Sequence, residues 1–221
     1  MNSTASWNFT LFNFPVRVHF SFFLIALLLG LGLGSILNLI IWVVIVFASV
    51  LIHELGHAFV SNSYGRSPQI ELYSMGGLTV STRYSLLPYP KEIFISFAGP
   101  LAGFILGGIM ILVNRYLGPF PNIYVNFLVQ QLIWVNIGWG ILNLIPIIPL
   151  DGGSIMRNIY HWLRNPYDEQ TPLKVSIAFG ILAVVAALVW LHSIYLAILA
   201  GWMIFNNFTA LRQGYWKDTF I

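Results

Sequence analysis

Apolar segments recur along this chain, and several are long enough to cross a lipid bilayer. A bilayer core about 30 Å thick requires roughly 20 consecutive, mostly apolar residues of helix. Of the 221 residues, 58% are hydrophobic and only 8% are charged, whereas a soluble domain carries about 25% charged residues. We therefore predict an all-α polytopic membrane protein that contacts the lipid bilayer, and not an ordinary soluble domain.

Six apolar segments can be delimited as membrane-spanning helices. They cover residues 16–34, 36–60, 93–113, 123–144, 175–190 and 194–211. With a cytoplasmic N-terminus, nine of the ten basic residues fall on one side of the membrane, and only Arg115 falls on the other. This asymmetry follows the positive-inside rule and predicts that both termini are cytoplasmic. The net charge of +3 then belongs to loops at the membrane surface, so nucleic acid is not an expected partner.

The segment between the second and third predicted helices has a different pattern. β-Branched residues on both sides of Gly76-Gly77 predict a β-hairpin from Gln69 to Arg83. It is too short to cross a bilayer, so we expect it at the membrane interface or dipping into the protein interior. In the third helix, Gly103 and Gly107 favour close packing of helix backbones.

The second predicted helix carries the sequence His53-Glu54-Leu55-Gly56-His57 near its end. Residues four apart lie on one face of a helix, so both histidines can offer an imidazole nitrogen to one Zn²⁺. Glu54 is then close enough to act on a water molecule at the metal. Ionisable groups at membrane depth are costly and are candidates for function by default. The alternative is a pair of helix-end histidines that face neighbouring helices.

A catalytic zinc site needs a third protein ligand and one open position. The chain has no cysteine, so that ligand is a carboxylate or another histidine. We favour Asp151, which follows the helix-breaking Pro146 and Pro149, because broken backbone at membrane depth is tolerated where it lines a cavity. Asp168 and Glu169 lie in a polar loop, and we interpret them as solvated.

Together these motifs resemble the site-2 protease family of intramembrane zinc metalloproteases, in a minimal form without a PDZ-like or cystathionine-synthase-type domain. The resemblance rests on four blocks in the family's order: residues 53–57, 76–77, 98–102 and 143–153. It implies one Zn²⁺ ion, with His53, His57 and Asp151 as zinc ligands and Glu54 as the catalytic base. Asn143 is implied to be a polar group in the substrate cleft. Gly103 departs from the family, where asparagine is frequent.

The resemblance also implies the substrate and the location. The substrate is expected to be a membrane-spanning protein, cut in or near its transmembrane segment in regulated intramembrane proteolysis. The chain would form one integral membrane domain, residues 1–221, with a catalytic core at about 36–153 and peripheral helices at 16–34 and 175–211. We expect a prokaryotic cell membrane, with the active site towards the cytoplasm.

Other hypotheses remain open at this point. An unwound substrate could add as a strand to the hairpin edge near Gly76 and Gly77, or the hairpin could be a loop that seals the cytoplasmic side. A metal-ion transporter or sensor could use the same three ligands without hydrolysis. Against transport, the sequence shows neither inverted repeats nor several midplane acids. An inactive scaffold is the third hypothesis. The physiological substrate and the oligomeric state do not follow from the sequence.

Overall fold

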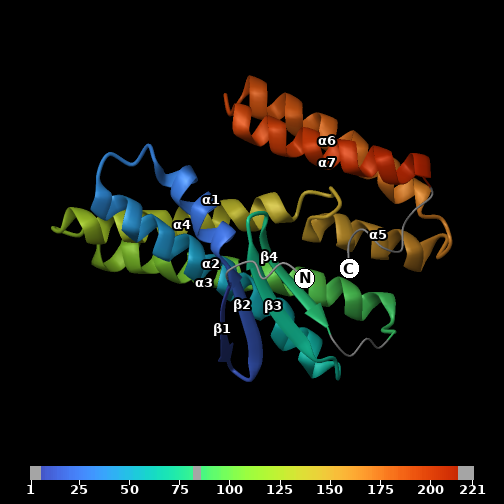
Figure 1. Cartoon of the computed structure of the whole chain (residues 1–221), viewed down its shortest axis with the longest axis horizontal. Coiled ribbons are helices and arrows are strands. Elements are labelled where there is room, and N and C mark those ends of the chain that lie inside the picture. Colours follow the sequence, from blue (N-terminus) through green and yellow to red (C-terminus); the bar gives the residue numbers. More distant parts are fainter. Residues whose placement is uncertain (1–5, 82–85, 214–221) are drawn as a thin grey trace. The chain divides into compact units, whose positions relative to one another are not determined.

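Helices dominate the computed structural model, which describes residues 6–81 and 86–213 (Figure 1). Its elements in chain order are β1 (Ser6–Leu11), β2 (Phe14–His19), α1 (Phe20–Gly30), α2 (Ile36–Ser63), β3 (Pro68–Tyr73), β4 (Gly76–Ser81), α3 (Tyr89–Leu117), α4 (Ile123–Asn143), α5 (Asp151–Leu163), α6 (Gln170–Val189) and α7 (Ile194–Gln213). Arg83, the predicted end of the hairpin, lies outside the described residues.

The described chain divides into two compact units. The first contains the four strands, α1, α2, most of α3 and nearly all of α4. The second contains the first residues of α3 together with α5, α6 and α7.

Five of the described helices are long and apolar enough to cross a membrane: α2, α3, α4, α6 and α7. The sixth predicted span, residues 16–34, is not confirmed. Its first residues belong to β2, and α1 has only 11 residues. At 1.5 Å per residue this helix measures about 17 Å, which is well short of the bilayer core.

The predicted hairpin is present as β3 and β4, but it is half of a four-stranded sheet with the order β1-β2-β3-β4. Strands β1 and β2 pair antiparallel, as do β3 and β4, while β2 and β3 pair parallel. The all-α prediction therefore missed the N-terminal strands. Whether the hairpin lies at the membrane interface or dips into the interior stays a prediction.

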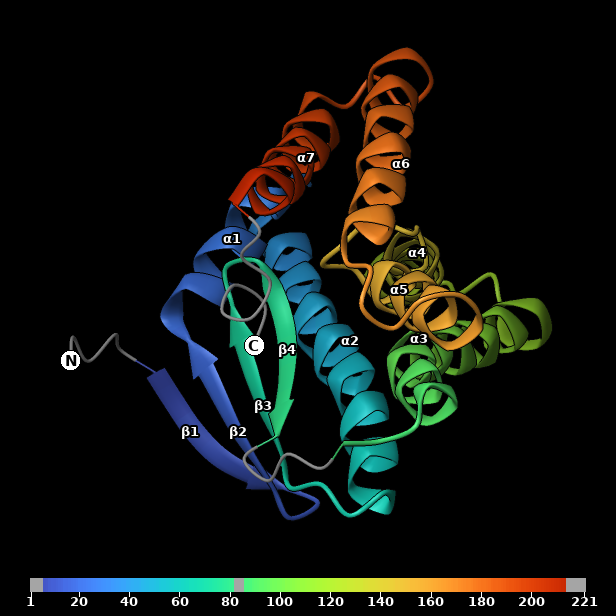
Figure 2. The same ribbon diagram turned by 90° about the vertical axis from the view of Figure 1, so that its right-hand side faces the viewer.

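One face of the sheet packs against α2, and Figure 2 shows the strands side by side along this helix. The strand residues of this core alternate in sequence, as a half-buried strand requires. Its helix residues are Phe22 of α1 and four residues from the C-terminal half of α2. The buried core consists of Phe14, Val16, Val18, Phe22, Val50, Leu51, Leu55, Ala58, Ile70 and Leu72. The sheet is thus fixed beside the part of α2 that carries the histidines.

Glycines allow α3 to approach its neighbours closely. A side chain at Gly56 of α2 would collide with the carbonyl of Ala98 on α3, and one at Gly107 of α3 would meet Ile137 of α4. Helix α4 is also tied to α2 by a buried hydrogen bond, in which Asn136 Nδ2 donates to Ser49 Oγ at 2.9 Å. These contacts hold the three helices of the first unit together.

In the second unit, α6 and α7 run side by side (Figures 1 and 2) and hold the loop that precedes α5. Gly180 of α6 makes room for Ile204 of α7. The backbone N–H of Ile148 donates to Ser176 Oγ at 2.9 Å, and its carbonyl accepts from Asn207 Nδ2 at 2.7 Å. Both polar side chains are fully buried. The peptide groups of Ile148, three residues before Asp151, are therefore anchored on both sides.

Candidate metal centre

The two motif histidines face each other on α2. Their Nε2 atoms lie 3.1 Å apart, and both side chains are buried. Zinc held tetrahedrally by two imidazole nitrogens at 2.0–2.1 Å would separate those nitrogens by about 3.3 Å. The pair therefore has nearly the spacing that one zinc ion requires. The alternative, in which the histidines face different helices, does not describe this geometry.

Gly99 of α3 keeps the space in front of this pair open. A Cβ atom placed there would collide with Nε2 of His57 and would lie 2.7 Å from Nε2 of His53. The methyl group of an alanine at position 99 would thus occupy the volume towards which both nitrogens point. A pair of nitrogens facing a small volume kept clear of side chains is what a bound cation needs, so the donor set and its surroundings fit zinc.

Glu54 lies between the two histidines in sequence, and β4 contacts its carboxylate. The side chain is buried, with 4% of its surface exposed. Thr79 Oγ1 donates to Glu54 Oε2 at 2.7 Å, and a Cβ at Gly77 would collide with the same carboxylate. Burial raises the pKa of the Tyr73 phenol, and the negative charges of Glu54 and Glu71 raise it further. Strand β4 thus gives the buried Glu54 carboxylate a hydrogen-bond partner.

Asp151 is the first residue of α5 and is partly buried. It belongs to the second unit, and its role as the third ligand beside His53 and His57 stays a prediction. Asn143 is the last residue of α4 and is also partly buried.

Three residues with a clear place at or behind these groups did not stand out in the sequence: Thr79, Ser176 and Asn207. Thr79 and Gly77 occupy alternate positions of β4, so a strand period of two would have put Thr79 on the same face as the glycine. Ser176 and Asn207 are polar residues inside apolar helices, which is itself a signal for a buried polar contact.

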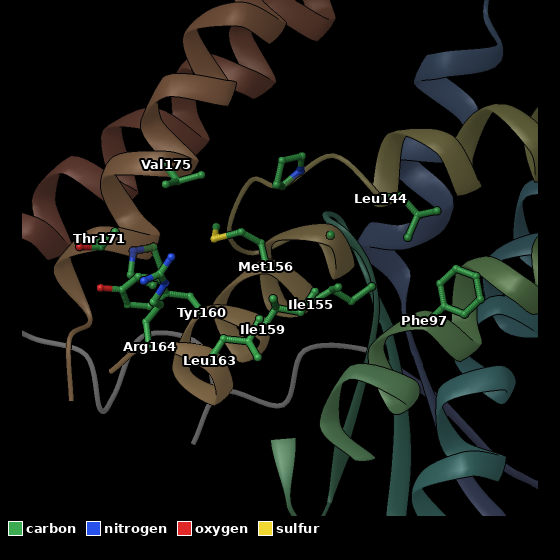
Figure 3. A pocket seen from close by; sticks show the side chains of 13 residues that line it. Phe97, Leu144, Ile155, Met156, Ile159, Tyr160, Leu163, Arg164, Thr171 and Val175 are labelled. Atoms are coloured by element: carbon green, nitrogen blue, oxygen red, sulfur yellow. The ribbon is translucent and has the colours of Figure 1, made fainter. Parts of the chain in front are cut away.

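An open groove of about 650 Å³ lies in the second unit (Figure 3), and it does not include a metal ligand. Apolar side chains line most of it, among them Ile155, Met156 and Ile159 of α5. Of its polar lining groups, Tyr160 and Thr171 both donate to Asp168. Those contacts tie Asp168, which lies in the loop before α6, to the start of that helix.

Comparisons with known proteins point to zinc metalloproteases. A family model described as "Peptidase M50B-like" matches residues 21–148, and one described as "Peptidase family M50" matches residues 116–187. A zinc metalloprotease of Methanocaldococcus jannaschii is 33% identical over 176 residues, which cover 78% of this chain and 49% of the relative. A putative zinc metalloprotease of Synechocystis is 29% identical over 221 residues, covering 90% of this chain and 57% of the relative.

Among solved structures, the site-2 protease from Methanocaldococcus jannaschii is similar to this chain, with a TM-score of 0.63 at 28% sequence identity. The match covers 98% of this chain and all of the solved one. The chain spans about half the length of the curated relatives it matches.

Proposed function

This chain belongs to the M50 family of peptidases, the site-2 proteases, and we propose that it hydrolyses peptide bonds in or near the transmembrane segments of other membrane proteins. It is a multi-pass membrane protein with several helices able to cross a bilayer. Its relatives are described as zinc metalloproteases, which favours hydrolysis over a metal-ion transporter or sensor.

The observation that carries the proposal is the pair of buried imidazoles with Nε2 atoms 3.1 Å apart, next to a buried carboxylate on the same helix. His53, His57 and Asp151 would hold the ion. Zinc, when bound, supplies a Lewis acid that acidifies water and polarises a peptide carbonyl.

Glu54 performs the proton transfers in this proposal. Its carboxylate accepts a proton from the attacking water and later delivers it to the departing amine nitrogen. Thr79 donates a hydrogen bond to Oε2 of this carboxylate. Burial between α2 and the sheet limits access of bulk water to this carboxylate. Asn143 would contact the substrate chain from the end of α4.

The substrate must unwind before attack, because the carbonyls of a membrane helix are engaged in hydrogen bonds. Strand β4 ends the sheet order and pairs with β3 alone among the described strands. An unwound segment could therefore add to its outer edge, with the glycines Gly76 and Gly77 leaving room for close approach. Contact of β4 with Glu54 supports this role over that of a loop which only seals the cytoplasmic side.

The orientation in the membrane is part of the proposal. Helix α1 follows β2 directly, and the proposal takes the segment with α1 as the first crossing, because Arg17 before it and Arg66 after α2 then lie on the same side. Helix α1 returns beside the start of α2, where Trp42 Nε1 donates to Ala26 O at 3.0 Å. The basic residues then keep the distribution expected for cytoplasmic termini in a prokaryotic cell membrane, with the active site towards the cytoplasm.

Two substitutions test the peptidase function directly. Glu54→Gln should reduce cleavage of a co-expressed single-span reporter to a small residual rate while purified protein keeps its zinc. Asp151→Asn should lower the zinc content of purified protein. Glu71→Gln is the matched control, since this β3 carboxylate pairs with Arg17 at 3.5 Å and takes no part in the proposed chemistry. Full activity of Glu54→Gln, or unchanged zinc in Asp151→Asn, would remove that residue from its role.

A further inference from the structure

Strand β4 presents two successive inward positions to the catalytic carboxylate. The register pairs Gly77 with Leu72 and Thr79 with Ile70. Directly paired residues share a face of the sheet, and Ile70 and Leu72 belong to the core packed on α2. Gly77 and Thr79 therefore face α2 as well, and both contact Glu54 there.

The contact from Thr79 is short and directional. Its Oγ1 lies 2.7 Å from Glu54 Oε2 and 3.1 Å from the backbone oxygen of the same residue. A hydroxyl has one proton, so the closer, charged carboxylate is the better acceptor. Among the described residues, Thr79 is the hydrogen-bond donor that the structure gives to the Glu54 side chain.

Threonine suits this task because of its branching. Two heavy atoms on Cβ restrict χ1 in a strand, so the hydroxyl has a defined position once β4 is docked. The adjacent inward position is glycine, and any side chain there would push the carboxylate away. One residue thus fixes Oε2, and the other leaves the volume that the carboxylate needs.

From this arrangement we infer that Thr79 is a positioning residue for catalysis: its hydroxyl holds Glu54 Oε2 and thereby fixes the rotamer of the base. The inference rests on the proposed peptidase function and adds to it the residue that orients the base. It also gives the sheet a role before any substrate binds, since β4 sets the rotamer of a residue on α2.

The test compares Thr79→Val with Thr79→Ser in steady-state cleavage of a reporter in detergent or liposomes. Valine keeps the branched shape and loses the hydroxyl, so kcat should fall about 10- to 100-fold, the cost of misplacing a catalytic group. KM and zinc content should stay at their wild-type values. Serine restores the donor and should recover most of kcat. Ile70→Val, which removes one methyl group opposite Thr79, is the packing control and should leave kcat unchanged.

A double-mutant cycle separates positioning from a general structural role. In a Glu54→Gln background, Thr79→Val should cause no further loss of residual cleavage. Wild-type kcat in Thr79→Val, an equal loss in Thr79→Ser, or the same fold-loss in both backgrounds would overturn the inference. A wild-type protein that does not cleave would instead overturn the proposed function, so the two failures are distinguishable.

Discussion

Substitution of Gly99 by alanine should be among the most damaging single-methyl changes in the metal centre. The added Cβ would lie 2.6 Å from His57 Cε1 and 2.7 Å from His53 Nε2. Ordinary contacts between such atoms are about 3.5–4.0 Å, so the methyl group overlaps both rings by nearly 1 Å. Relief by movement of α3 is opposed because Ala98 already touches Gly56 of α2.

The cost can be expressed as metal affinity. Overpacking of a well-packed site costs about 1–3 kcal/mol. If the histidines must rotate away to relieve the overlap, that energy is lost from zinc binding, which at 1.4 kcal/mol per tenfold corresponds to roughly 5- to 150-fold weaker affinity. Competition with a chelator of known zinc affinity measures this, and circular dichroism checks that the helices remain formed.

Gly108→Ala provides the matched control on the same helix. A Cβ at Gly108 meets nothing within 4 Å, so this variant should bind zinc and cleave like the wild type. Wild-type zinc affinity in Gly99→Ala would refute the reasoning, because it would show that the volume beside the two nitrogens is not where the ion binds.

Three other substitutions probe the surroundings of the site. Gly77→Ala places a methyl group 2.5 Å from Glu54 Cγ, so cleavage should fall at least tenfold, by the cost of misplacing a base, while zinc content stays normal. Asn207→Leu removes the donor to Ile148 O; an unsatisfied buried carbonyl costs about 1–3 kcal/mol, and the thermal midpoint should drop by several degrees, with weaker zinc binding. Hydrogen bonds from Thr171 and Tyr160 lower the pKa of Asp168, so wild type should melt above Asp168→Asn at neutral pH. This difference in thermal midpoint should shrink as the pH falls below about 4, where the carboxyl of the unfolded chain takes up its proton. An undiminished difference at pH 3 would contradict the prediction.

The histidine pair was predictable because its geometry is local. Four-residue spacing on a continuous helix fixes the relative positions of His53 and His57 without any knowledge of the rest of the fold. The observed separation of 3.1 Å between their Nε2 atoms bears this out. The five long apolar helices are local in the same sense, since each is recognisable from its own run of residues.

The N-terminal strands were not predictable from runs of apolar residues alone. Strand β2 passes directly into α1, so its apolar residues merge with the helix that follows. Its inward positions Phe14, Val16 and Val18 do alternate with Pro15 and Arg17, and this was the available signal. Strand β2 pairs with β1, just before it in the chain, and with β3, more than 50 residues later. The second, non-local pairing leaves no mark on a short segment.

The loop that presents Asp151 shows a second limit of sequence reasoning. Two prolines indicate that the helix must break before this residue, but they do not say what holds the broken segment in place. The structure answers with Ser176 and Asn207, which satisfy both peptide groups of Ile148. A serine and an asparagine in separate apolar helices become meaningful only when a common partner is known. Helices α6 and α7 thus anchor the segment that precedes Asp151, the third ligand in our proposal.

The proposed strand addition would place an extended substrate beside α2, the helix that carries the two histidines. An open strand edge is costly in lipid because its N–H and C=O groups have no water to bond, so an edge kept beside a catalytic helix needs a partner. Neighbouring strands lie about 4.8 Å apart, and β4 already contacts Glu54 through Thr79. A substrate strand added to β4 would therefore lie one strand spacing from the residue that holds the base. A helical substrate has no free backbone groups to offer that edge, so the proposed strand pairing would select for the unwound form that hydrolysis requires.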